Sequence, residues 1–244
     1  RRYPVIYLLH GFTDDESAWV QFGEVNRAAD KGIEAGDIPP LIIVMPDAGV
    51  TWYINDRQGK VRYEDMFVQE LIPHVDKAYR TRPKREFRGV AGLSMGGWGA
   101  LVYAMRHPDL FAACAAFSAA VWTDEDFAAW DDKSYAEMLG PVFGPQPAGA
   151  ARLTAHYQSH NPLDLARTMD LKTLNKVRYY LDCGDDDFLF KGNSALHVVL
   201  AGRKIPHEFR VRDGGHTWAY WRTGIGDGLA FIGRVQQHLR QKWR

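Results

Sequence analysis

A serine between glycines is the first feature of the sequence that could do chemistry. Gly92-Leu93-Ser94-Met95-Gly96 follows an apolar run at residues 87–91 and precedes a helical pattern that begins near Gly97. A serine in a sharp strand–turn–helix turn presents its hydroxyl above the sheet, and its strained backbone requires neighbours that lack a Cβ atom. The positive end of the helix that follows stabilises developing negative charge. The pattern therefore predicts that Ser94 is a nucleophile for acyl transfer.

A serine hydroxyl needs a base to take its proton, and histidine suits that task near neutral pH. A nucleophile in this kind of turn is followed along the chain by an acid and then by a histidine. Four histidines meet that order: His197, His207, His216 and His238. His216 follows a Gly-rich turn just past the last expected strand, where an imidazole would lie over the end of the sheet. The other three fall in helical or strand patterns, so His216 is the expected base.

Several carboxylates compete to orient the histidine. Asp182-Cys183-Gly184-Asp185-Asp186-Asp187 follows the strand expected at residues 177–181. Asp182 is expected to belong to that strand still, whereas Asp185 and Asp186 suit a turn or a helix start. Spacing alone leaves Asp185, Asp186 and Asp187 open.

The expected oxyanion hole is built from backbone rather than side chains. The strand expected at residues 5–9 runs into His10-Gly11-Phe12. An N–H from such a loop, together with the N–H of the residue after the nucleophile, binds the oxyanion of acyl transfer. Those donors would be the amides of Phe12 and Met95. Gly11 permits the turn, and we expect His10 to make a structural hydrogen bond.

Short apolar runs alternate with helical stretches along the chain, which indicates the α/β class with a mostly parallel central sheet covered by helices on both faces. The expected strands are residues 5–9, 41–45, 87–91, 113–117, 177–181 and 208–212. The expected helices are residues 65–79, 97–106, 194–203 and 228–242. Residues 123–165 interrupt the alternation and suggest a lid-like insertion within a single domain over residues 1–244.

Composition excludes several classes of protein. The chain has 30 Lys and Arg against 30 Asp and Glu, so no basic excess favours nucleic acid as a partner. Apolar residues make up 46%, as in ordinary globular domains. The longest nearly apolar run, residues 112–122, is shorter than the roughly 18–20 residues that cross a bilayer, so we expect no membrane segment.

Neither a metal nor another cofactor is expected. The histidines lack the spacing of metal ligands on a helix face. Cys114 and Cys183 are too few for a disulfide framework and fall in apolar runs, so we expect two buried thiols. Composition does not indicate an oligomeric state.

Taken together, the motifs resemble a known group of enzymes. Tyr7-Leu8-Leu9-His10-Gly11, Gly92-Leu93-Ser94-Met95-Gly96-Gly97, Cys183-Gly184 with Asp187-Phe188, and Gly215-His216 with Trp218 are similar to the esterase D-like branch of the α/β-hydrolases. That branch includes feruloyl and acetyl-xylan-type esterases, S-formylglutathione hydrolases and mycolyltransferases. The resemblance spans nearly the whole chain, and it implies the α/β-hydrolase fold.

The resemblance also implies residue roles. In that family the acid is the third residue after the glycine that follows the strand, which is Asp187 here, with Asp185 as the second choice. The family places its oxyanion donors at the positions of Phe12 and Met95. Family members carry one or two further strands before the strand expected at residues 5–9, and we expect these N-terminal strands to be missing from the fold of this sequence.

Aromatic residues suggest the class of substrate. Trp52, Tyr53, Trp122 and Trp218 follow expected strands or the expected base, and their flat apolar rings would suit an aromatic acyl group or a sugar face. The segment from Pro46 to Tyr53 is similar to the feruloyl-esterase members, which act on hydroxycinnamate esters of plant xylan. A small-molecule or carbohydrate ester is therefore the expected partner.

The residues leave other functions open. These functions are an S-formylglutathione hydrolase or general short-chain esterase, acyl transfer to a sugar, and a non-catalytic binding module on a hydrolase scaffold. Because the sequence opens with Arg1 rather than Met, we expect a secreted or periplasmic location over a cytoplasmic one.

Overall fold

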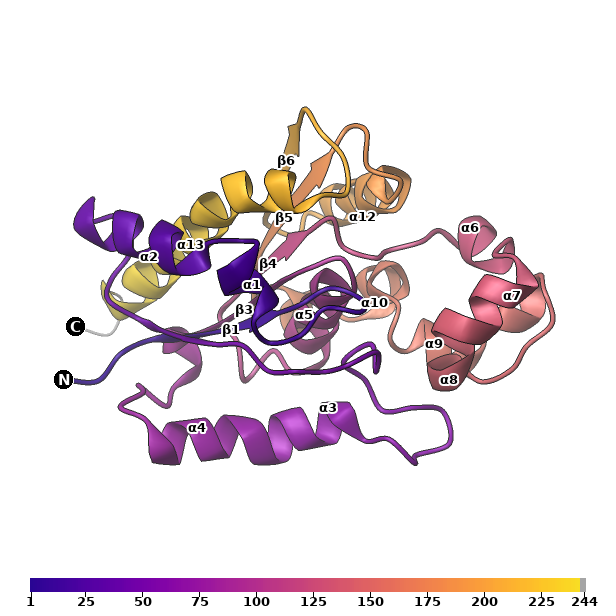
Figure 1. Ribbon diagram of the computed structural model, residues 1–244, viewed down its shortest axis with the longest axis horizontal. Coiled ribbons are helices and arrows are strands. Elements are labelled where there is room, and N and C mark those ends of the chain that lie inside the picture. Colours follow the sequence, from indigo (N-terminus) through magenta and orange to yellow (C-terminus); the bar gives the residue numbers. More distant parts are fainter. Residues whose placement is uncertain (242–244) are drawn as a thin grey trace.

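The computed structural model describes residues 1–241 and contains a six-stranded sheet whose strand pairs are all parallel (Figure 1). The order is β2-β1-β3-β4-β5-β6, so the chain turns from one direction to the other between β1 and β3. Open α/β sheets bind ligands at such a point, outside the carboxyl ends of the strands. The strands are β1 (Val5–Leu9), β2 (Ile42–Val44), β3 (Arg88–Leu93), β4 (Ala113–Phe117), β5 (Arg178–Gly184) and β6 (His207–Arg212).

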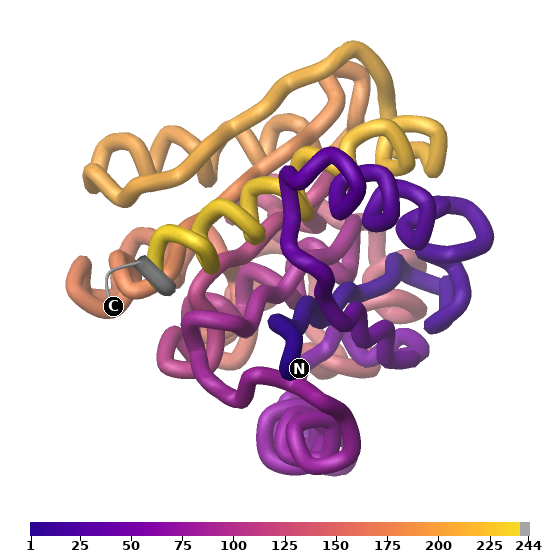
Figure 2. The backbone as a smooth tube through the Cα atoms, turned by 90° about the vertical axis from the view of Figure 1, so that its left-hand side faces the viewer, coloured from indigo at the N-terminus to yellow at the C-terminus, as the bar shows by residue number. Residues whose placement is uncertain are grey.

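Helices cover both faces of the sheet. One face carries α5 (Met95–Arg106), α10 (Pro162–Thr168), α12 (Phe190–Gly202) and a rod made of α3 (Tyr63–Met66), the π-helical turn η1 (Phe67–Leu71) and α4 (Ile72–Ala78). The other face carries α1 (Ala18–Gln21), α2 (Val25–Glu34) and α13 (Trp218–Gln241). Helices α2 and α13 lie side by side, and the rod is seen end-on in Figure 2. The short helices η2 (Arg85–Phe87) and α11 (Leu171–Leu174) precede β3 and β5.

Strand β1 shows why the sheet needs both helical layers. Its five residues are all buried, and they alternate between two apolar clusters. Val5, Tyr7 and Leu9 pack with the α5 side, whereas Ile6 and Leu8 pack with the α13 side. A strand covered on both faces is apolar throughout, as the sequence pattern predicted.

Each expected strand and helix is present, which confirms the α/β class, although several boundaries differ. The expected strand at residues 177–181 extends to Gly184, so Asp182 does belong to it. The expected helix at residues 194–203 begins at Phe190, and the helix expected from residue 228 begins ten residues earlier, at Trp218. Its expected end, Lys242, lies outside the described residues. Helix α2 was not predicted, because Glu24 before it has a left-handed backbone and offers no capping signal.

Residues 123–165 form a series of short helices: α6 (Asp124–Ala128), α7 (Asp132–Ser134), η3 (Tyr135–Leu139), α8 (Gly140–Phe143), η4 (Ala150–Arg152), α9 (Ala155–Gln158) and the start of α10. Phe127, Phe143 and Tyr157 are fully buried and belong to the same apolar cluster as Trp98 of α5. Buried Arg152 lies over the Tyr135 ring and donates to the Trp130 carbonyl. The insertion is therefore packed onto the sheet layer, and its movement as a lid stays a prediction.

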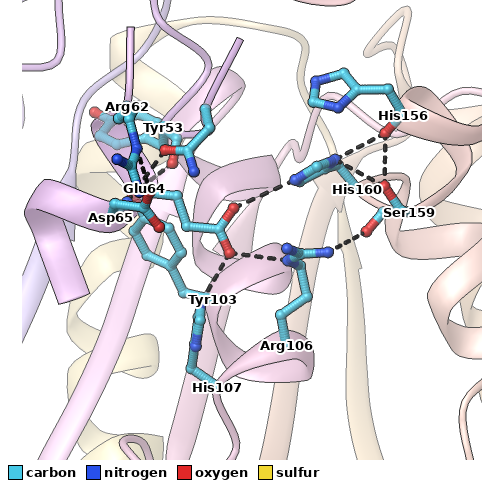
Figure 3. Close-up of polar contacts among 11 residues, drawn as sticks. Tyr53, Arg62, Glu64, Asp65, Tyr103, Arg106, His107, His156, Ser159 and His160 are labelled. Carbon is cyan, nitrogen blue, oxygen red and sulfur yellow. Dashed lines mark hydrogen bonds and ion pairs between the residues drawn. The ribbon is translucent and has the colours of Figure 1, made fainter. Parts of the chain in front are cut away.

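A buried carboxylate ties the base of the insertion to the rod and to α5 (Figure 3). Glu64 of α3 accepts from Arg106 Nε at 2.8 Å, and its Oε1 lies 2.7 Å from His107 Nε2. Its Oε2 lies 3.3 Å from Nε2 of His160, which follows α9. Burial raises the pKa of Glu64, but the surrounding histidines and Arg106 outweigh it and hold that pKa well below its usual range.

None of the helices described here is both long enough and apolar enough to cross a lipid bilayer.

Candidate active site

Three side chains that are distant in the sequence meet at the carboxyl ends of the strands. Nε2 of His216 lies 3.0 Å from the Ser94 hydroxyl oxygen. Nδ1 of the same ring lies 2.9 Å from Oδ2 and 3.1 Å from Oδ1 of Asp187. In the arrangement that satisfies all three groups, the Nδ1–H donates to the carboxylate and the serine hydroxyl donates to Nε2. This geometry can move a proton from the serine to the imidazole.

Ser94 lies in the strained turn that the glycines predicted. It follows β3 and precedes α5 with φ of 52° and ψ of −118°. A Cβ atom on Gly92 would lie 2.3 Å from the Gly96 carbonyl oxygen, and one on Gly96 would lie 2.4 Å from the Leu9 carbonyl oxygen. Glycine is therefore required at both positions for the turn to close. The Ser94 side chain is half-buried and reaches solvent.

Asp187 is held as an ionised acceptor. Its side chain is buried, and its Oδ1 accepts the Leu189 N–H at 2.9 Å. Burial alone would raise the pKa of Asp187, but hydrogen bonds from His216, the Leu189 amide and Ser118 lower it below its ordinary value. The carboxylate can thus fix one tautomer of His216 and stabilise its charged form.

The other carboxylates at the end of β5 and just after it have different surroundings from Asp187. Asp185 is exposed, and its Oδ1 accepts the Gly214 N–H at 3.1 Å, so it holds the turn before His216 rather than the ring. Asp186 is exposed as well. Asp182 is fully buried, accepts from Arg212 of β6 and receives the Tyr220 hydroxyl at 2.5 Å. These contacts fasten both ends of the loop that carries His216.

The loop after β1 lies beside the serine, as the expected oxyanion hole requires. A Cβ atom on Gly11 would lie 3.8 Å from the Ser94 Cβ. Met95 is the first residue of α5, where backbone N–H groups lack an acceptor inside the helix. The amides of Phe12 and Met95 remain the expected donors. His10 has the structural role predicted for it: its Nδ1 donates to the Gly11 carbonyl, and its Nε2 accepts the Ala48 N–H at 2.9 Å.

Two of the aromatic residues expected to line the substrate are core residues instead. Trp52 is 2% exposed and Tyr53 is 0% exposed. Left-handed backbone at both positions turns the chain back, and the Tyr53 ring lies against Gly99 of α5. The Tyr53 hydroxyl donates to the His10 carbonyl at 3.0 Å. Tyr53 therefore supports the loop after β1, and its complete burial contradicts its expected contact with substrate.

Trp122 and Trp218 are also engaged by other rings. Trp122 is buried against Trp52 and Trp130, so this structure does not present it to a substrate. Trp218 is half-buried beside Trp19 of α1, and its ring also packs against Trp221. The position of an aromatic residue after a strand did not reveal which way its ring would point.

Two further residues contact the Ser94–His216–Asp187 relay: Trp221, which lies among the aromatic residues that follow the expected base, and Ser118, which was not expected at the site. Trp221 packs its ring edge-on to His216, with ring centroids 4.8 Å apart, and donates from Nε1 to the Ser118 hydroxyl. Ser118 directly follows β4, has φ of 43° and helps to lower the Asp187 pKa. Its place after a strand, at the same sheet edge as Ser94, was the available signal. Phe188, next to Asp187, is exposed at the rim.

Metal-binding groups are sparse among the described residues. The acidic side chains of Asp185, Asp186 and Asp213 come within 4.8 Å of one another, but all three are exposed, and such clusters are common without an ion. Cys114 and Cys183 are buried free thiols, as predicted, and burial raises the pKa of each.

The parallel sheet, the strained serine after β3 and the histidine after β6 define an α/β-hydrolase fold, and solved structures of that fold agree. A ferulic acid esterase structure superposes with a TM-score of 0.80 at 31% identity, covering 97% of this chain and 86% of that one. Residues 1–232 match the family model described as "Putative esterase". The chain belongs to that esterase family.

Relatives of known name agree with the family assignment. An esterase from Mycobacterium tuberculosis is 30% identical over 235 residues, which cover 89% of this chain and 49% of that protein. The present chain thus spans about half the length of this curated relative. The S-formylglutathione hydrolase from Staphylococcus aureus is 23% identical with a TM-score of 0.73, covers 95% of this chain and 84% of that one, and agrees in fold.

Proposed function

We propose that the protein is a serine carboxylesterase that hydrolyses feruloyl or related hydroxycinnamoyl esters of plant cell-wall carbohydrate through an acyl-enzyme. The observation that carries the serine mechanism is the continuous hydrogen-bonded relay from Ser94 through His216 to Asp187. Family membership supports ester hydrolysis, and the likeness to a ferulic acid esterase at 31% identity supports the acyl group.

The reaction proceeds in two halves. Nε2 of His216 takes the Ser94 proton while the serine oxygen attacks the ester carbonyl. Asp187 stabilises the resulting imidazolium, and the amides of Phe12 and Met95 bind the oxyanion. The tetrahedral intermediate collapses when the alcohol leaves with the proton from His216. Water then attacks the acyl-enzyme with the same base, which releases the acid and restores Ser94.

The second candidate is an S-formylglutathione hydrolase, which the same relay could serve. The likeness to such an enzyme at 23% identity extends to the fold alone, whereas the ferulic acid esterase is more similar in both sequence and structure. Acyl transfer to a sugar is a variant of the first candidate, in which an alcohol replaces water in the second half.

The test is a comparison of kcat/KM on methyl ferulate, acetylated xylan and S-formylglutathione, with Ser94→Ala as the control for background hydrolysis. We expect methyl ferulate to exceed S-formylglutathione by about tenfold or more, which corresponds to about 1.4 kcal/mol in transition-state binding. Fast thioester turnover with poor cleavage of methyl ferulate would establish the second candidate instead. Product analysis with an added sugar alcohol separates hydrolysis from acyl transfer.

A further inference from the structure

Phe188 is an apolar ring held out into solvent at the edge of the site. Its 74% exposure is the greatest among the large apolar side chains described. Its neighbours are fixed: Asp187 is buried, Leu189 is 2% exposed and donates its N–H to Asp187 Oδ1, and the Phe190 N–H donates to the Asp187 carbonyl at 2.9 Å. A rigid turn thus presents an aromatic ring that the core does not use.

The position of this ring relative to His216 identifies the part of an ester that it would meet. The ring centroids of Phe188 and His216 are 4.6 Å apart, with an angle of 47° between the rings. Because His216 Nε2 returns its proton to the leaving alcohol, that alcohol must lie beside His216 during the reaction. The Phe188 ring contacts the same imidazole that returns the proton, so it lies in position to border a leaving alcohol at His216.

The charged side chains on the loops near Phe188 restrict the kind of alcohol that could bind there. Asp185, Asp186 and Asp213 are exposed on the two loops that carry Asp187 and His216. Lys191, the next cation along the chain from Phe188, pairs with Asp126 of α6 at 2.6 Å. Like charges disfavour an anionic leaving group such as glutathione. A neutral sugar offers an apolar ring face to the aromatic side chain and hydroxyls to the carboxylates.

We infer that Phe188 forms a leaving-group subsite that stacks on the sugar ring of a carbohydrate ester and sets the preference for the alcohol. The inference rests on the proposed function, since it requires an ester whose alcohol leaves beside His216. It adds a residue and a chemical class to that function: a neutral, polyhydroxylated alcohol, selected by an exposed aromatic face within an acidic rim.

The experiment compares two substrates with the same acyl group, methyl ferulate and a feruloylated arabinoxylan oligosaccharide, on the wild-type chain, Phe188→Ala and Phe188→Trp. We expect Phe188→Ala to lower kcat/KM on the oligosaccharide by about tenfold, mainly through KM, because one aromatic contact of this kind is lost. Methyl ferulate should change by less than about twofold, since methanol is too small to stack. Phe188→Trp should retain the preference for the oligosaccharide.

Tyr79→Ala is the matched control, because Tyr79 is a 57% exposed aromatic residue at the far end of α4. Equal losses on both ferulates would show that Phe188 acts through His216, and no loss on either would show that it contacts no alcohol. Both outcomes overturn the inference. If the wild-type chain cleaves acetyl esters but no ferulate, the proposed acyl group is wrong, and acetylated xylo-oligosaccharide against methyl acetate then tests Phe188 separately.

The exposed carboxylates of Asp185, Asp186 and Asp213, which form the acidic rim, can be tested separately. Asp186→Asn combined with Asp213→Asn should raise kcat/KM on S-formylglutathione severalfold at low ionic strength, and added salt should reduce the gain. An unchanged rate would contradict the role assigned to the charges.

Discussion

The three side chains of the relay are each held by a group outside it. The Ser94 N–H donates to the Phe117 carbonyl at 2.9 Å, Asp187 receives the Leu189 amide, and the His216 ring packs against Trp221. A site whose donors and acceptors are fixed before substrate arrives needs little reorganisation during reaction. The relay geometry is thus a property of the folded chain.

Removing either reacting side chain should abolish turnover without unfolding the protein. We expect Ser94→Ala and His216→Ala each to lower kcat on p-nitrophenyl acetate by at least about 10³-fold, since the remaining groups cannot generate the nucleophile. His238→Ala replaces an exposed histidine of α13 and should keep full activity. Turnover retained in either site variant, with an unchanged circular dichroism spectrum, would refute the assignment.

The choice of acid can be decided by comparing two carboxylates of the same loop. Asp187→Asn should lower kcat by roughly 10²–10⁴-fold, because an amide no longer stabilises the charged imidazole. Asp185→Asn should cost much less, since its carboxylate holds only the Gly214 amide. A larger loss of kcat in Asp185→Asn than in Asp187→Asn would show that the acid is misassigned.

Loops at the ends of the strands hold the candidate site residues, and buried polar contacts fix the positions of these loops. Asp182 of β5 joins Arg212 at the end of β6 to Tyr220 at the start of α13, on either side of His216. Glu64 does the corresponding work away from the site, where it joins the rod to α5 and to the base of the insertion.

Glu64 offers a test of that structural role. Glu64→Gln removes the charge that Arg106 and two histidines surround. Removal of one partner of a buried ion pair typically lowers the free energy of unfolding by about 3–5 kcal/mol, and we expect a smaller loss here because Arg106 reaches solvent. We expect Tm to fall by roughly 6–12 °C. Glu70→Gln changes an exposed residue of the same rod and should leave Tm unchanged. A Tm equal to that of Glu70→Gln would show that the cluster does not hold the elements together.

Much of the fold and of the candidate site was predictable from the sequence, because local backbone geometry and burial favour the observed elements. The elbow follows from glycines that leave no room for a Cβ atom, and strands β1 and β4 follow from apolar runs covered on both faces. Asp187 could not be separated from Asp185 by spacing, because the choice depends on where the turn after β5 ends; the family resemblance favoured Asp187.

The sequence did not predict the direction in which the aromatic rings point. Trp52 and Tyr53 follow a strand, as rim residues do, yet their left-handed backbone directs both rings into the core. Non-glycine residues seldom adopt that conformation, so no pattern signals it. The start of α13 was missed because its first residues include Tyr220 and Trp221, whose side chains contact Asp182 and His216 and so interrupt a simple helical pattern.

For the whole molecule, the site is a consequence of topology. The chain changes direction between β1 and β3, and the loops that leave those two strands carry Phe12 and Ser94. The two flanking layers bury separate apolar clusters, so the sheet edge where the loops meet rests on a core packed from both sides.

The protein as a whole should lose stability in mild acid. Burial, with His160 nearby, lowers the pKa of His156 from 6.5 to about 4, so the folded chain favours the neutral ring. Between pH 6.5 and about 4, the unfolded chain binds a proton that the folded chain resists, and stability falls as the pH falls. The depressed pKa of Glu64 adds a loss of the same sign, which begins below its ordinary value of 4.5.

Thermal melts from pH 7 to pH 4 measure this effect. We expect Tm to decline across that range, and His156→Gln to flatten the part of the decline that lies above pH 5. If Tm fell with pH equally steeply in His156→Gln and in the wild-type chain, the loss of stability could not be assigned to His156.

Pre-steady-state kinetics on p-nitrophenyl acetate, with peptide mapping by mass spectrometry, can detect a covalent acyl-enzyme on Ser94. We expect a burst of p-nitrophenol close to one equivalent per chain, with the acetyl group on the Ser94 peptide and no burst in Ser94→Ala. Hydrolysis without a burst or adduct in acid-quenched samples, or an adduct on another residue with turnover intact in Ser94→Ala, would contradict this expectation.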